Sequence, residues 1–137
     1  MAKSKKVWMW VEDKPKINPT ESEKQEMTDF FQPLIEEFKL GIKPRKDLTS
    51  NIIVDIYSKW VRNFFYLCEK WEGYYERNQK YEFSESKFVR MEFMGRDKLN
   101  FSYFRHTGKW WLVYENITME RSLKEILENH NFQPMFF

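Results

Sequence analysis

The chain has 137 residues, a formal net charge of +2 and 19% aromatic residues, which fits one domain with a core built from large side chains. A basic excess this small is atypical of proteins that grip duplex DNA, because those neutralise many phosphates. Cys68 is the only cysteine, and His106 and His130 are the only histidines. An internal disulfide and a four-thiolate zinc site are therefore excluded, and we expect neither a metal nor a cofactor.

Residues 1–19 form a predicted N-terminal tail that is basic and contains tryptophan. Its apolar run, residues 7–11, is too short for a signal sequence or a membrane span, so we expect a cytoplasmic protein with no membrane contact. Trp8 and Trp10 would form an exposed apolar patch if nothing covered them. The run therefore predicts an added edge strand on its own domain, and docking of Trp8 and Trp10 on a partner chain is the alternative.

A first helix is predicted over residues 20–40. Thr20 and Glu23 have the spacing of a capping box, and Gly41 offers a C-cap. Apolar residues then recur at helical spacing, namely Met27, Phe30, Phe31, Leu34, Ile35 and Phe38. Pro33 removes a backbone donor, so we expect a kink or a brief break near Phe31.

Two strands are predicted after a basic loop over residues 42–50. Residues 52–57 and 61–67 are rich in β-branched and aromatic side chains, and we expect them to be joined near residues 58–60. A helix over residues 50–60 is the alternative, because short apolar runs do not fix the period. The polar segment 73–81 ends this pair.

The segment 88–94 resumes strand alternation and allows a prediction of register. A loop of two or four residues after it would place Met91 opposite Ser102, so that an apolar face would meet a polar one. We therefore predict a three-residue loop or a bulge at Gly95. Phe93 would then lie opposite Phe101, and Met91 opposite Tyr103.

Residues 99–114 hold two aromatic-rich alternating runs on either side of Thr107 and Gly108, which is typical of a β-hairpin. The predicted apolar face carries Phe101, Tyr103, Trp110, Leu112 and Tyr114. The predicted mixed face carries Asn100, Ser102, Phe104, His106, Lys109, Trp111 and Val113. Arg105 is predicted opposite Trp110, which suits a cation–π contact.

A second helix is predicted over residues 119–130, with Leu123, Ile126 and Leu127 as its apolar stripe. The chain then ends in apolar residues, so we expect its C-terminus to pack back onto the sheet. The predicted fold is a single α+β domain over residues 20–137. It comprises an N-terminal helix, an antiparallel meander of four to five strands and a C-terminal helix, with both helices on one sheet face.

The strands and the last helix carry a family resemblance. The elements are Phe88-Val89-Arg90-Met91, Leu99-Asn100-Phe101-Ser102-Tyr103, Lys109-Trp110-Trp111-Leu112-Val113-Tyr114, the helical Leu123, Ile126 and Leu127, and the terminal Phe136-Phe137. In these elements the chain resembles a small bacterial family of uncharacterised proteins, domain of unknown function "three-zero-two-four". The resemblance implies the fold given above and no particular chemistry.

The mixed face of the sheet is the predicted binding site. With the strand before the hairpin included, it comprises Arg90, Glu92, Asn100, Ser102, Phe104, His106, Lys109 and Trp111. Aromatic side chains beside Arg and Lys can stack bases or hold an aromatic or anionic ligand. The alternative is structural: Phe104 and Trp111 would form a cross-strand pair that stabilises the hairpin.

Three functions remain open, and we assign no catalytic residue. The first is a non-enzymatic binding module that contacts a protein partner or a second copy of itself through the mixed face or the tail. The second is single-stranded nucleic-acid binding through Phe104, Trp111, Arg90 and Lys109, which the composition favours less. The third is a small enzyme that acts on an anionic substrate, with His106 or Glu92 as acid or base.

Overall fold

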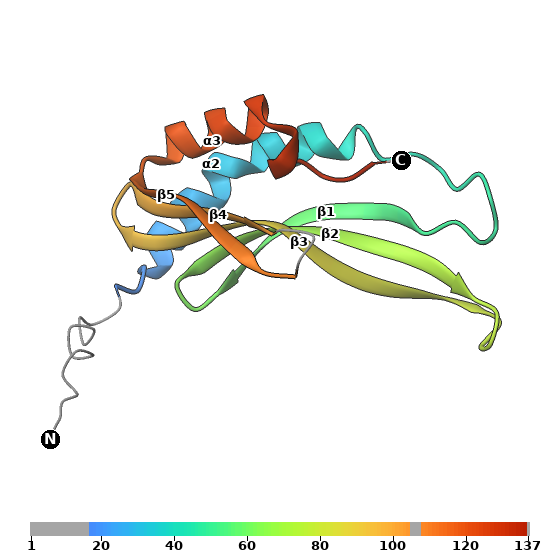
Figure 1. Cartoon of the computed structure of the whole chain (residues 1–137). Coiled ribbons are helices and arrows are strands. Elements are labelled where there is room, and N and C mark those ends of the chain that lie inside the picture. Colours follow the sequence, from blue (N-terminus) through green and yellow to red (C-terminus); the bar gives the residue numbers. More distant parts are fainter. Residues whose placement is uncertain (1–16, 105–107, 137) are drawn as a thin grey trace, which may run out of the picture.

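The computed structural model describes residues 17–104 and 108–136, and it has the predicted α+β architecture (Figure 1). Helices α2 (Glu21–Lys39) and α3 (Met119–Glu128) lie on one face of a five-stranded antiparallel sheet. The strands are β1 (Ile52–Val61), β2 (Phe64–Tyr75), β3 (Lys80–Gly95), β4 (Lys98–Phe104) and β5 (Trp110–Ile117), and a short 3-10 helix, η1 (His130–Phe132), follows α3. The strands are neighbours in sequence order, so the sheet is the expected meander. The predicted strand over residues 7–11 lies outside the described residues.

The predicted capping box begins α2. The Thr20 hydroxyl accepts a hydrogen bond from the Glu23 amide at 3.1 Å, and the Thr20 amide donates to Glu23 Oε1 at 2.9 Å. Two of the four free N–H groups at the helix start are thereby satisfied.

No helix in the described ranges is long and apolar enough to cross a membrane.

Helix α2 continues through Pro33 without the predicted break. Phe31 and Ile35 are fully buried on either side of the proline. Their burial anchors the helix to the core on both sides of the proline. The C-cap residue is Leu40 rather than the predicted Gly41, which follows it.

Strands β1 and β2 form a longer hairpin than the sequence predicts. The turn lies at Arg62 and Asn63, and the predicted joint near residues 58–60 is wrong, as is the alternative helix over residues 50–60. The alternation continues through the expected joint because Trp60 packs on the Phe65 ring at 5.1 Å and donates to the Thr28 hydroxyl of α2 at 3.2 Å. Arg62 has a φ of 57° and turns the chain.

Strands β3 and β4 pair with the predicted bulge beside Gly95, where φ is +134°. Met91 lies opposite Phe101 and Phe93 opposite Leu99, so the predicted partners are wrong by two residues. A shift of two residues keeps every side chain on its face. The apolar faces of the two strands therefore still coincide, as predicted.

The core lies between the sheet and the two helices. The Phe31 ring contacts Phe65 at 5.6 Å from the α2 side, and Phe101 and Met91 are fully buried beside them. The C-terminal segment packs back as predicted, because the Phe132 ring meets Phe101 at 4.8 Å.

Helix α3 contributes less to the core than its predicted stripe. Ile126 is fully buried, and Leu123 packs partly against the core. Leu127 was expected in the same stripe, but it is 55% exposed. The buried line of α3 runs through Ser122 and Ile126, four residues apart, and the 3.6-residue period turns Leu127 away from that line.

Candidate functional site

One face of the sheet has no helix over it among the residues that the structure describes (Figure 1). Cross-strand pairing defines this face, because directly opposed residues point to the same side. We call it the open face. It includes Asp55, Tyr57, Lys59, Val61, Phe64, Tyr66, Cys68, Lys70, Glu72, Phe83, Glu85, Lys87, Arg90, Glu92, Asn100, Ser102, Phe104, Trp110 and Leu112.

Arg90 occupies the middle of the open face and is held between two aromatic rings. Its guanidinium lies 4.8 Å from the Phe64 ring and 5.1 Å from the Trp110 ring. Tyr66 and Phe104 extend the group, with ring centroids 5.8 and 5.2 Å from Trp110. We call Phe64, Tyr66, Phe104 and Trp110 the aromatic cluster. It comes from three strands, so it depends on the folded sheet.

A second group of contacts on the open face surrounds Glu85. Its carboxylate accepts hydrogen bonds from the Tyr57 hydroxyl, from Lys59 Nζ at 3.2 Å and from Lys87 Nζ at 3.1 Å. These donors, Tyr57 first, lower the pKa of Glu85 to about 2. Burial and the bond to Glu85 raise the pKa of Tyr57 well above its ordinary value. The bond to Glu85 also raises the pKa of Lys87.

Glu85 should make folding stability depend on acid. The folded-state pKa lies below the ordinary value of 4.5, so the unfolded chain takes up the proton first and protonation favours unfolding. Stability should be complete above about pH 4.5 and should fall as the pH drops toward about 2.

Urea titrations of wild type and Glu85→Gln across this pH range test the dependence. In the variant, the slope of the free energy of unfolding against pH should be smaller by up to about the contribution of one bound proton. Glu82→Gln is the matched control, because Glu82 lies half-buried on the same strand and accepts from Asn78 rather than from any of the three donors to Glu85. Parallel curves for wild type and Glu85→Gln would contradict the assignment.

Five of the predicted site residues share the open face, as the alternation predicts. They are Arg90, Glu92, Asn100, Ser102 and Phe104. Ser102 is only 3% exposed, so it supports the face without being available for contact. Lys109 is exposed just before β5. His106 and Arg105, like Trp8 and Trp10, lie outside the described residues.

The predicted faces of the first half of β5 are wrong. Trp111 lies opposite Tyr103 and therefore points to the helical side, whereas Trp110 lies opposite Phe104 on the open face. Leu112 lies opposite Ser102 and shares the open face. The register shifts between Phe101 and Ser102, and a bulge of one residue turns every side chain before it to the other side.

Most residues of the open face are not among the predicted site residues. Phe64, Tyr66 and Lys87 were given no face, although β2 alternates between these aromatics and the buried Phe65 and Leu67. That alternation was the available signal. Trp110 could not be found in the same way, because its position depends on the bulge in β5.

The cysteine of the open face is not placed for nucleophilic chemistry. Cys68 is fully buried, and burial, followed by the charge of Glu85, raises the pKa of its thiol to about 12. A protonated thiol is a poor nucleophile. Within the described ranges, no group of three or more His, Cys, Asp or Glu side chains could hold a metal ion. The geometry instead suits contact through rings and cations.

Comparison with known proteins identifies a family. A model of the family described as Domain of unknown function (DUF3024) matches residues 34–134, which include all five strands and α3. This match confirms the resemblance carried by the strands and the last helix. No curated protein and no solved structure matches the chain.

Proposed function

The chain belongs to the DUF3024 family, a domain of unknown function, and we propose that it is a non-enzymatic binding module that contacts a protein partner through the open face. The observation that carries the proposal is Arg90, held between Phe64 and Trp110 on the side of the sheet away from the helices. Trp, Tyr and Arg are the side chains that dominate binding energy at protein interfaces. Three of them, Trp110, Tyr66 and Arg90, lie together here.

Several side chains of the open face are held in place before any partner binds. Arg90 is already fixed by two rings, and Lys87 lies over the Tyr66 ring at 5.4 Å. Side chains that are ordered before binding lose less conformational entropy when a partner docks. Exposed apolar groups lie beside them, with Phe104 44% and Leu112 51% exposed.

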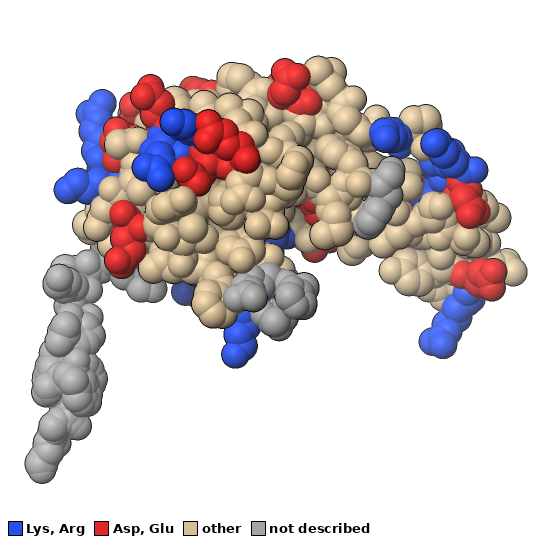
Figure 2. All heavy atoms as spheres, turned by 45° about the horizontal axis from the view of Figure 1, so that its top comes forward, with Lys and Arg blue, Asp and Glu red and all other residues tan. Residues whose placement is uncertain are grey.

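The charges of the open face define the partner. Four cations, Lys59, Lys70, Lys87 and Arg90, lie with four carboxylates, Asp55, Glu72, Glu85 and Glu92. Asp55 is already paired with Lys39, and Glu72 is already paired with Arg45. The Glu85 carboxylate is already engaged by three donors. A complementary surface therefore offers apolar side chains opposite the aromatic cluster and carboxylates opposite Arg90 and Lys70. Acidic and basic side chains are also mixed over the helices on the other side (Figure 2).

Site-specific crosslinking in cells tests the proposal. A photoreactive residue at Leu112, on the open face, should crosslink one partner, and the same residue at Leu127 of α3 should not. Leu127 is the matched control because its exposure is similar, at 55% against 51%. Adding Trp110→Ala to the Leu112 reporter should abolish the product.

The purified partner is then titrated with wild type, Trp110→Ala and Arg90→Gln. Loss of either side chain should weaken binding at least about tenfold, as expected for a central anchor. Leu127→Ala should bind as wild type does. Equal affinities for all four proteins would contradict the proposal, provided that their unfolding curves show them folded.

Single-stranded nucleic acid is the second candidate, favoured by the contact between Phe104 and Trp110 beside the Arg90 guanidinium. Such faces stack successive bases on aromatic rings and track the backbone with cations. It predicts that oligonucleotides quench tryptophan fluorescence at low salt and less at high salt. Quenching that Arg90→Gln abolishes, with no crosslinked protein, would replace the protein partner by this ligand.

A further inference from the structure

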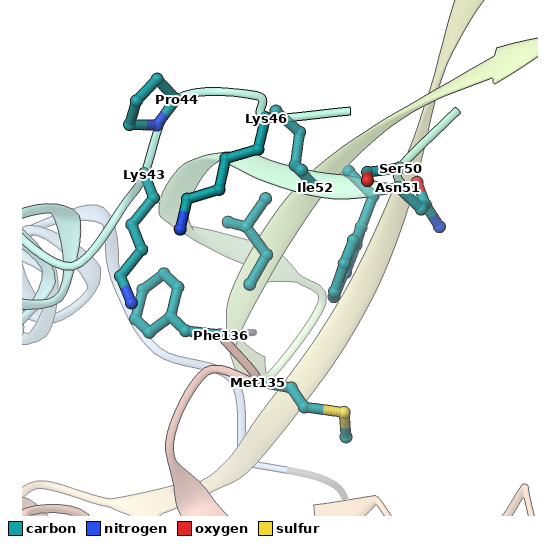
Figure 3. A pocket seen from close by; sticks show the side chains of 10 residues that line it. Lys43, Pro44, Lys46, Ser50, Asn51, Ile52, Met135 and Phe136 are labelled. Carbon is teal, nitrogen blue, oxygen red and sulfur yellow. The ribbon is translucent and has the colours of Figure 1, made fainter. Parts of the chain in front are cut away.

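A second candidate site lies on the other side of the sheet, in a cavity of about 400 Å³. It is enclosed by the loop between α2 and β1, by the first residues of β1, by β2 and by the C-terminal segment (Figure 3). Sites for small molecules have volumes of roughly 300–1,000 Å³ and mostly apolar walls with a few polar groups. This cavity has both properties.

The walls and the mouth of the cavity differ in chemistry. Ile53 and Trp71 form apolar walls from the sheet, and Phe136 forms one from the C-terminal segment. Lys43 and Lys46 extend from the loop toward the cavity (Figure 3). In the space-filling view, this end of the molecule carries Lys and Arg side chains with Asp and Glu side chains among them (Figure 2).

The loop is held so that these two lysines remain available. Arg45 lies between them in sequence and is engaged elsewhere: its Nη2 donates to Glu72 Oε1 at 3.0 Å, and its guanidinium lies 4.5 Å from the Tyr81 ring. Asp47, the nearest acid in sequence, accepts from the Thr49 amide at 3.2 Å. Within the described part of the chain, neither lysine has a carboxylate within ion-pair distance.

The wall that Phe136 contributes is preformed. The Phe136 ring lies so close to Gly41 that a Cβ there would be 2.9 Å from its Cε2 atom. Gly41 is thus the residue that admits the ring, although it does not cap α2. The backbone amide of Met135 donates to the buried Glu69 carboxylate at 2.8 Å, which fixes the segment just before Phe136.

We propose that this cavity binds a small organic anion with an aromatic or aliphatic body. The body would lie between Ile53, Trp71 and Phe136, and the carboxylate or phosphate would lie between Lys43 and Lys46. Burial of the body supplies most of the binding energy, and the cations select for the charge. The site shares no residue with the open face, so its test is independent of the proposed function.

Calorimetric titration of the full chain with naphthoate tests the charge requirement. Naphthoate should bind at least about tenfold more tightly than neutral naphthamide, a difference of about 1.4 kcal/mol. Lys43→Gln/Lys46→Gln should remove this preference and leave the weak binding of naphthamide unchanged. The matched control is Lys98→Gln/Lys124→Gln, which changes the net charge equally at two exposed lysines away from the cavity.

A variant that fills the cavity tests whether the apolar body of the ligand is needed for binding. Ile53→Trp places a large ring between the apolar walls without changing charge, and it should abolish binding of naphthoate in a protein whose unfolding curve shows it folded. Inorganic phosphate alone should bind far more weakly than naphthyl phosphate. The proposal is overturned if no anion binds at millimolar concentration, if phosphate binds as tightly as naphthyl phosphate, or if the control double variant loses binding as the cavity variant does.

Discussion

Truncation of Phe132 to alanine is expected to remove about 3–5 kcal/mol from the free energy of unfolding. Phe132 is 2% exposed, and its ring meets Phe101 at 4.8 Å and Tyr103 at 5.3 Å, edge to face in both contacts. The lost ring would leave a cavity against β4 that the sheet cannot close. A domain of this size has roughly 5–15 kcal/mol of stability, so the variant should be close to unfolding at physiological temperature.

The effect of Phe132→Ala also reports how the C-terminal segment is held. The ring is the main apolar contact between η1 and the sheet, so its removal should free the chain that follows. Urea denaturation followed by circular dichroism measures the loss. Phe83→Ala is the matched control, because it deletes the same ring from a site that is 59% exposed and should cost less than about 1 kcal/mol. Similar losses for the two variants would show that Phe132 does not belong to the core.

The fold could be predicted because local signals agree with one another. The capping box at Thr20 and Glu23 begins α2, and the alternation of β3 and β4 places Met91 and Phe101 in the core. Each signal depends on residues close together in sequence. The predicted register of β3 and β4 is wrong by two residues for the same reason. The local pattern decides which face each side chain occupies, but the turn that closes the hairpin decides which residues are paired.

The open face could be predicted only where no bulge intervenes. Arg90, Asn100 and Phe104 follow simple alternation, and their shared face was predicted. Trp110 and Trp111 each lie on the side of the sheet opposite to the predicted one, because of a bulge in β5 that no residue type indicates. As a result, Trp110 and not Trp111 completes the aromatic cluster.

The cavity beneath Lys43 and Lys46 could not be predicted at all. Its walls come from segments that lie far apart in sequence, and they meet only because Phe136 packs against Gly41 at the end of α2. The sequence predicted that the C-terminus packs back onto the sheet. The sequence does not predict where on the sheet the C-terminal segment packs. That placement brings Phe136 to the wall of the cavity.

Glu69 should be the most sensitive charged residue of the chain. Its carboxylate is 4% exposed on the helical side of β2, and both oxygens accept hydrogen bonds. Oε1 accepts from the Trp71 indole at 3.1 Å, and Oε2 accepts from the Met135 amide at 2.8 Å. The carboxylate thus joins the second strand to the C-terminal segment, residues that are 66 positions apart.

Glu69→Ala is expected to cost about 2–4 kcal/mol, because it leaves two buried donors without this acceptor and opens a void. Glu69→Gln keeps the shape and one acceptor oxygen, so it should cost about half as much. Glu115→Ala, at an exposed position on β5, is the control and should change the free energy of unfolding by less than about 0.5 kcal/mol. Urea denaturation at neutral pH should therefore rank the losses as Glu69→Ala, then Glu69→Gln, then Glu115→Ala. If Glu69→Ala is no less stable than Glu115→Ala, the carboxylate does not hold the C-terminal segment, and the wall that Phe136 gives to the cavity must be fixed by its packing on Gly41 alone.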